Sequence, residues 1–138
     1  MKVHLAALLA VVAVTAACGG PTNPSQNATD MFSGSVQPLS LGPIHTFNVP
    51  NLGEITVTVN SITPGNTFLG VKYGQPAGND CLAIQQNVVS SSNLGRTALS
   101  GSIIVKGTYC VVLFDPIGLI GGAPLTVAQN YSVTVSHP

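Results

Sequence analysis

The sequence predicts an all-β fold: a two-sheet antiparallel β-sandwich of jelly-roll type with about eight strands. Apolar and polar residues alternate with a period of two, which is typical of strands that bury one face. Turn residues separate these runs at intervals of about ten residues. The 15 glycines and 10 prolines interrupt every window long enough for a useful helix.

The strands differ in how strongly the pattern marks them. In residues 54–60, the side chains of Ile55, Val57 and Val59 fall on one face and the threonines on the other. Residues 108–114 are apolar on both faces, which predicts a central, covered strand. Residues 82–86 fit either a strand or a short helical turn. The eight expected strands lie near residues 32–37, 44–49, 54–62, 67–73, 82–88, 97–104, 108–114 and 130–136.

The first 17 residues are typical of an export signal. Lys2 precedes an apolar run at 5–14, which is too short for a membrane span of roughly 20 residues. Thr15, two alanines and then Cys18 follow this run. The arrangement resembles the bacterial lipobox, in which the cysteine is lipidated and becomes the first mature residue, although Thr15 stands where that motif usually has leucine. The alternative is an ordinary secretory signal with an incidental Cys18.

The lipobox resemblance implies a lipid anchor and a location in the cell envelope. Several acyl chains such as palmitate on Cys18 would hold the protein stably in a membrane. Gly19, rather than aspartate, follows the cysteine, which implies the outer membrane if the bacterium has two membranes. The protein would then face either the periplasm or the exterior.

Residues 18–30 have the composition of a flexible tether. They contain two prolines, two glycines and no aliphatic residue larger than alanine, so they bury too little apolar area to offset the entropy of ordering. The twelve residues after Cys18 would span on the order of 20 Å as a flexible coil. We therefore expect a signal peptide at 1–17, a tether at 18–30 and one sandwich domain at 31–138.

Cys81 and Cys110 are the cysteines that remain if Cys18 carries lipid. An even pair in an exported chain favours a disulfide. Closing a loop of about 30 residues would stabilise the domain by roughly 3 to 4 kcal/mol in the chain-entropy model. A metal site or a catalytic thiol is the weaker alternative, because no histidine lies near either cysteine in the sequence.

Charge and spacing weigh against several function classes. Four Lys and Arg residues cannot make the basic surface that nucleic-acid binding requires. The mature chain has four acidic residues, and they are far apart in the sequence. We therefore expect neither a calcium site, which needs several carboxylates, nor the paired carboxylates of a glycosidase. These acids are Asp30, Glu54, Asp80 and Asp115. We therefore expect no metal and no cofactor.

Serine-hydrolase chemistry finds little support. No Gly-x-Ser-x-Gly motif is present, and His45 falls on the apolar face of its own strand with Phe47. His137 lies beside the C-terminus, where disorder is common. We expect Asp115, before Pro116, to cap a turn by accepting backbone N–H bonds. The sequence thus predicts a protein that is not an enzyme and has no catalytic residues.

The last two expected strands carry a resemblance to a known family. Residues 107–116, Gly-Thr-Tyr-Cys-Val-Val-Leu-Phe-Asp-Pro, and residues 130–135, Asn-Tyr-Ser-Val-Thr-Val, are similar to the closing strands of bacterial pre-peptidase C-terminal-like domains. Residues 32–36 and 45–49 match the opening strands of that family in outline, so the resemblance covers roughly 31–138. It implies a β-sandwich accessory module. Residues 68–73 carry a lysine where that family often has calcium-linked acids, so calcium binding is not implied here.

Three residues are the candidates for a binding loop. Tyr73 precedes a turn-rich segment and is the aromatic residue that we select as a candidate sugar platform, whereas most other aromatics fall on inward faces. Leu119 and Ile120 lie in an uncharged, glycine-rich apolar loop at 117–125, and exposed apolar patches often mark binding sites. The alternative is that these two side chains tuck under the sandwich as a lid.

These observations predict a membrane-anchored envelope lipoprotein whose β-sandwich is a non-catalytic binding or accessory module. Its expected partners are the membrane, through Cys18, and an envelope protein or glycan. Two alternatives stay open: a structural envelope component that packs through its sheets, and a small hydrolase. The sequence does not indicate an oligomeric state.

Overall fold

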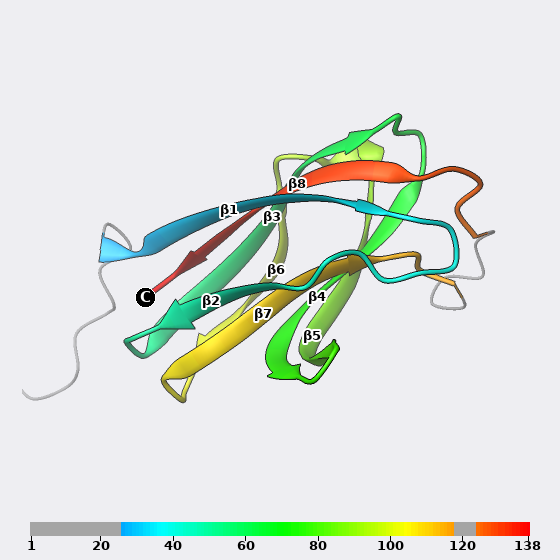
Figure 1. Ribbon diagram of the computed structural model, residues 1–138. Helices are drawn as coiled ribbons and strands as arrows, with labels where there is room; N and C mark the ends of the chain where they lie inside the picture. Colours follow the sequence, from blue (N-terminus) through cyan, green and yellow to red (C-terminus); the bar gives the residue numbers. More distant parts are fainter. Residues whose placement is uncertain (1–25, 118–123) are drawn as a thin grey trace, which may run out of the picture.

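The structure, a computed structural model, describes residues 26–117 and 124–138 (Figure 1). Cys18, Leu119 and Ile120 lie outside these residues. The described residues form eight strands, one at each expected position. They are β1 Ala28–Val36, β2 His45–Val49, β3 Gly53–Thr63, β4 Phe68–Ala77, β5 Asp80–Ser90, β6 Thr97–Ile103, β7 Gly107–Phe114 and β8 Gln129–His137. A short 3-10 turn, Ser91–Asn93, joins β5 to β6.

The strands build two four-stranded antiparallel sheets with the orders β1-β8-β3-β6 and β2-β7-β4-β5. The pairs are nested along the chain: β1 with β8, β2 with β7, β3 with β6 and β4 with β5. β4 and β5 are joined by a tight hairpin turn, and the other connections cross from one sheet to the other. Nested pairing of eight strands in two sheets is the jelly-roll arrangement, and the expected fold class is confirmed.

The core lies between the two sheets and follows the alternation in the sequence. Ile55, Val57 and Val59 of β3 are buried in it, and so are Val133 and Val135 of β8. β3 and β8 contribute every second residue because successive side chains point to opposite faces of a sheet.

Strand β7 is covered on both faces, as its uninterrupted apolar run predicts. Val111 and Leu113 belong to the core between the sheets. Cys110 and Val112 are fully buried in a second, smaller cluster with Cys81. Residues 82–86 belong to β5 and are not helical, because β5 is paired with β4 along its length except at a register shift that leaves Ile84 without a partner.

The first strand begins earlier than expected. Ala28, Thr29 and Asp30, the last three residues of the expected tether, pair with the end of β8. Their composition is typical of a tether. They are nevertheless ordered, because their backbone N–H and C=O groups find hydrogen-bond partners in β8. His137 lies in β8 and is buried, so disorder at this position was the wrong expectation.

The two ends of the sandwich carry different loops (Figure 1). We call the end where β1 begins and β8 ends the tether end; the connections 50–52 and 104–106 also lie there. We call the opposite end the distal end; the connections 37–44, 64–67 and 91–96 lie there, as do residues 115–117 and 124–128 of the β7–β8 connection. No helix within the described ranges is long and apolar enough to cross a membrane.

Candidate functional site

Two loops at the distal end are joined by one buried carboxylate. Asp115 directly follows β7, and its Oδ2 accepts hydrogen bonds from the backbone N–H groups of Leu39, at 2.8 Å, and Leu125, at 3.0 Å. Asp115 accepts backbone N–H bonds as expected, but its donors lie 76 and 10 residues away in the sequence, so it does not cap a local turn. The donors come from two different loops, so the carboxylate connects 37–44 to 115–128. Its other oxygen, Oδ1, is buried and has no hydrogen-bond partner among the described residues.

Backbone bonds hold the loop at 37–44 against the end of β7. The N–H of Asp115 donates to the carbonyl of Ser40 at 3.1 Å, and the N–H of Gly42 donates to the carbonyl of Leu113 at 2.8 Å. The hydroxyl of Ser40 donates to the carbonyl of Gln37 at 2.9 Å, which closes a turn. The loop is therefore a fixed part of the sandwich.

Leu39 has a backbone conformation that bulky residues rarely adopt. Its φ is +60°, in the left-handed region, and its side chain is 69% exposed. Such a conformation costs of order 1–3 kcal/mol and persists only where surrounding contacts impose it. The hydrogen bond to Asp115 is one such contact, and it holds Leu39 with its side chain in solvent.

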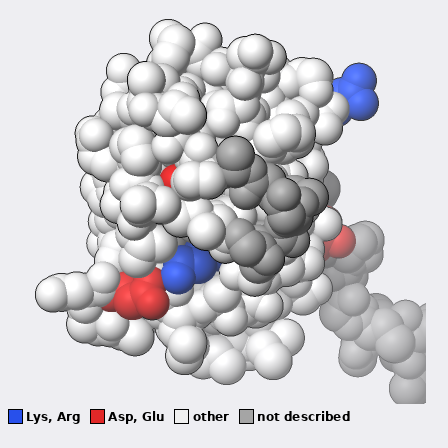
Figure 2. All heavy atoms as spheres, turned by 90° about the vertical axis from the view of Figure 1, so that its right-hand side faces the viewer, with Lys and Arg blue, Asp and Glu red and all other residues white. Residues whose placement is uncertain are grey.

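Three further exposed apolar residues lie in the same two loops at this end. Leu41, Ile117 and Val127 are each about half exposed. We call Leu39 and these three residues the distal apolar surface. Figure 2 views this end of the molecule, and few of the described side chains in it are charged. Exposed apolar clusters on soluble domains often mark contact sites, so this is the strongest candidate for a binding surface.

Tyr73 is not part of a binding loop, and its selection as an exposed aromatic was wrong. It lies within β4, is 2% exposed and points into the core with Leu69 and Val71. Burial, together with the nearby Tyr109, raises the pKa of its hydroxyl. The two-residue alternation from Leu69 through Val71 already places Tyr73 on the inward face. Phe68, at the start of β4, is instead an exposed aromatic residue.

His45 faces Tyr131 of the opposite sheet. The imidazole Nε2 and the tyrosine hydroxyl share a hydrogen bond of 3.0 Å, and the ring of Phe32 stacks on the imidazole with centroids 4.8 Å apart. Burial lowers the pKa of His45 and raises the pKa of Tyr131 to about 12. Within the described residues, no serine or carboxylate hydrogen-bonds to His45, so they contain no Ser–His–acid set built on it.

A second histidine pair was missed by the sequence reasoning. His137 Nε2 donates to Asp30 Oδ2 at 2.9 Å, and the imidazole stacks on Phe47 with centroids 5.1 Å apart. The ring is nearly inaccessible, and its Nδ1 lies 3.4 Å from the carbonyl oxygen of Pro138. This leaves no imidazole nitrogen open to a substrate, so the pair joins the two terminal strands. The alternation Tyr131, Val133, Val135 extends to His137 and was the available signal.

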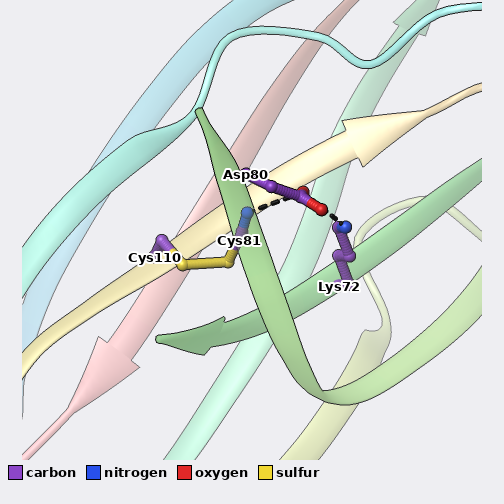
Figure 3. A network of polar contacts seen from close by, with 4 residues as sticks. All are labelled: Lys72, Asp80, Cys81 and Cys110. Carbon is purple, nitrogen blue, oxygen red and sulfur yellow. Dashed lines mark hydrogen bonds and ion pairs between the residues drawn. A yellow bond between two sulfur atoms is a disulfide. The ribbon is translucent and has the colours of Figure 1, made fainter. Parts of the chain in front are cut away.

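Cys81 and Cys110 form the expected disulfide on the outer face of the β2-β7-β4-β5 sheet, with their Cα atoms 5.9 Å apart (Figure 3). It joins β5 to β7 across β4, although β5 pairs only with β4. The start of β5 folds over Gly74, where a Cβ would overlap the carbonyl of Leu82. The disulfide therefore holds the β4–β5 hairpin against the sheet.

An ion pair lies beside the disulfide. Lys72 Nζ is 2.9 Å from Asp80 Oδ1, which also accepts the N–H of Cys81 at 2.7 Å (Figure 3). These two donors, Lys72 first, lower the pKa of Asp80. Lys72 also lies over the ring of Phe114, 5.9 Å from its centroid. Asp80 is the first residue of β5, directly after the turn, and it has a structural role here.

Two shallow hollows lie on the described surface. One, of about 240 Å³, lies between the edges of β5 and β6, where the Asn87 amide donates to the carbonyl of Ala98. The other, of about 280 Å³, lies over β3 and β6 around Glu54 and Gly101. The second hollow is also lined by Ser100 and Ser102, but no hydrogen bond joins the Glu54 carboxylate to a serine hydroxyl among the described residues, and no histidine lines either hollow. In the part of the chain that the structure describes, no three His, Cys, Asp or Glu side chains are grouped to hold a metal ion.

Comparison with known proteins adds no family. No protein-family model matches the sequence, and no curated protein matches it.

Proposed function

We propose that this chain is an envelope lipoprotein, anchored by lipid at Cys18, whose β-sandwich is a non-catalytic binding module. The single observation that carries the proposal is the separation of the two ends. The chain enters the domain at Ala28, at the tether end, and the distal apolar surface lies at the opposite end. A binding surface at the free end of an anchored domain is accessible to partners.

The disulfide supports placement outside the cytoplasm. Disulfides form and persist in oxidising compartments and are rare in cytosolic proteins. The Cys81–Cys110 bond is fully buried in the outer cluster of the sheet, so it is a permanent part of the fold. This agrees with export by the signal that residues 1–17 resemble. This support for export is independent of lipidation at Cys18.

The chemistry of the distal apolar surface favours a protein partner over a glycan. Its described members are the aliphatic residues Leu39, Leu41, Ile117 and Val127, and Phe68 is the one exposed aromatic side chain among the described residues of this end, whereas sugar rings stack on aromatic platforms. The bonds to Asp115 hold the surface in place before binding, which lowers the entropy cost of association. The proposed partner is therefore an envelope protein with an apolar contact site. The resemblance to pre-peptidase C-terminal-like accessory modules agrees with such a role.

Two variants test this proposal by quantitative pull-down from envelope extract. Ile117→Ser combined with Leu41→Ser changes the distal apolar surface, and Met31→Ser changes an exposed residue of β1 outside that surface as the control. We expect wild type and Met31→Ser to recover the same partner and the distal variant to lose it. Equal recovery by all three proteins would contradict the proposal.

A structural role is the second candidate, and one observation favours it. β5 is an edge strand, and its Leu82 and Ile84 side chains are both more than half exposed. Exposed apolar edges promote pairing with other chains. If the protein packs laterally in the envelope, the delipidated domain should associate at high concentration and Leu82→Lys should prevent this. A strict monomer in a sedimentation experiment would argue against it.

A further inference from the structure

The tether end carries an apolar patch of its own. Ile104 is 80% exposed, and Leu52 and Val105 are each more than half exposed. Gly53 pairs with Ile103, so Leu52 and Ile104 extend from neighbouring positions of β3 and β6. We call Leu52, Ile104 and Val105 the tether-end patch. It lies at the opposite end of the molecule from the distal apolar surface.

The backbone beneath this patch is well fixed. The hydroxyl of Tyr109 donates to the carbonyl of Val105 at 2.7 Å. Val49 pairs with Gly107, and Ile103 is buried in the core, so both connections begin and end on ordered strands. The three apolar side chains are therefore held toward solvent by the fold.

The length of chain before β1 limits how far this patch can be from an anchor at Cys18. Ten residues, 18–27, precede Ala28, which starts β1 at the same end of the sandwich. A fully extended chain of ten residues reaches at most about 35 Å. A flexible chain of that length has a root-mean-square span of about 17 Å. An anchor at Cys18 would keep the tether end close to the membrane surface.

We propose that the tether-end patch docks on the lipid bilayer, with Leu52, Ile104 and Val105 entering the boundary between headgroups and acyl chains. This inference rests on the proposed lipid anchor at Cys18. The anchor alone would leave the domain free to rotate, whereas docking would fix its orientation. The distal apolar surface then faces away from the membrane.

The charges near the patch indicate which force drives docking. Lys106 follows Val105 and is exposed, so its long side chain can reach headgroup phosphates while its stem covers apolar surface. Glu54 follows Gly53 and is also exposed, which balances this positive charge. Docking is therefore driven by apolar burial, and it should occur on zwitterionic phosphatidylcholine vesicles and persist at high salt.

The chain contains no tryptophan, which allows a direct test. The mature lipidated protein is prepared as Ile104→Trp, with Phe68→Trp as a matched control. Both replace exposed apolar residues, the first at the tether end and the second at the distal end. Each protein is reconstituted in phosphatidylcholine vesicles with and without brominated acyl chains, which quench tryptophan only at short range. Flotation of the vesicles reports anchoring separately.

We expect both proteins to float with the vesicles. The tryptophan emission of Ile104→Trp should be blue-shifted and strongly quenched by brominated lipid, whereas the emission of Phe68→Trp should be unchanged. Flotation without quenching of Ile104→Trp, or equal quenching of the two variants, would overturn docking and leave the anchor standing. Failure of both proteins to float would overturn the anchor and the docking together.

Discussion

Asp115 is the residue on which the candidate binding surface depends most. Asp115→Ala removes the acceptor of the Leu39 and Leu125 N–H groups and leaves one partly buried and one buried donor without a partner. We expect the free energy of unfolding to fall by about 2–6 kcal/mol, since each orphaned donor costs about 1–3 kcal/mol. Urea denaturation followed by circular dichroism measures this.

Asp115→Asn is the matched control, because the amide oxygen can still accept both bonds. We expect it to retain most of the stability that Asp115→Ala loses. If the two variants lose the same amount, the hydrogen bonds to the carboxylate do not hold the loops together.

Ionisation of Tyr131 should lower the stability of the domain at alkaline pH. Burial raises its pKa to about 12, whereas an unfolded tyrosine ionises near pH 10. Above pH 10 the unfolded chain therefore loses this proton first. Stability from this group is complete below pH 10 and declines as the pH rises toward 12.

Tyr131→Phe should remove this contribution to the decline. The variant loses the hydrogen bond to His45 and about 1 kcal/mol at neutral pH. Melting temperatures measured from pH 8 to 11 should then fall less steeply for Tyr131→Phe than for wild type. Parallel profiles would show that Tyr131 does not titrate as its burial implies.

Single residues also show where sequence reasoning fails. The turn-rich segment after Tyr73 suggests an exposed side chain, yet its position in the alternation places it in the core. The proximity of His137 to the chain end suggests disorder, yet the same alternation places it inward. Chain position and neighbouring turns are weak signals, and the period of two is the stronger one.

At the scale of elements, the disulfide is the clearest source of stability. It closes a loop over a sequence separation of 29 residues and fixes β5 to β7. Replacing Cys81 and Cys110 together by alanine should lower the free energy of unfolding by about 3–4 kcal/mol in the chain-entropy model. Equilibrium denaturation of the oxidised wild type and the double variant measures this difference.

A wild-type sample kept reduced serves as the control, because it lacks the bond but keeps both side chains. It should denature close to the double variant. A double variant as stable as the oxidised wild type would show that the ion pair between Lys72 and Asp80 and the β4–β5 ladder hold the hairpin without the bond.

The existence of the strands could be predicted, and their pairing could not. Each strand is marked locally by alternating side chains, so all eight were found. Pairing β1 with β8 joins residues about a hundred positions apart, and nothing local specifies such a contact. The early start of β1 was missed for the same reason: Ala28 to Asp30 are ordered by a strand at the other end of the chain.

At the scale of the whole molecule, the fold separates two apolar surfaces. The nested topology brings the start of β1 to one end and the Asp115-linked loops to the other. The sequence marked part of the distal surface through the apolar stretch at 117–125. Leu39 and the tether-end patch could not be predicted from the sequence, because their apolar residues lie in loops and form a common surface only when the fold brings those loops together.

The proposed anchoring and docking of the domain both depend on acylation of Cys18. Cells grown with a labelled fatty acid, expressing either wild type or Cys18→Ala, test it when the protein is isolated and its mature N-terminus is determined by mass spectrometry. We predict label on wild type, a mature chain that begins at Cys18, and no label on Cys18→Ala. An unlabelled, water-soluble wild-type protein with a different N-terminus would contradict the lipid anchor.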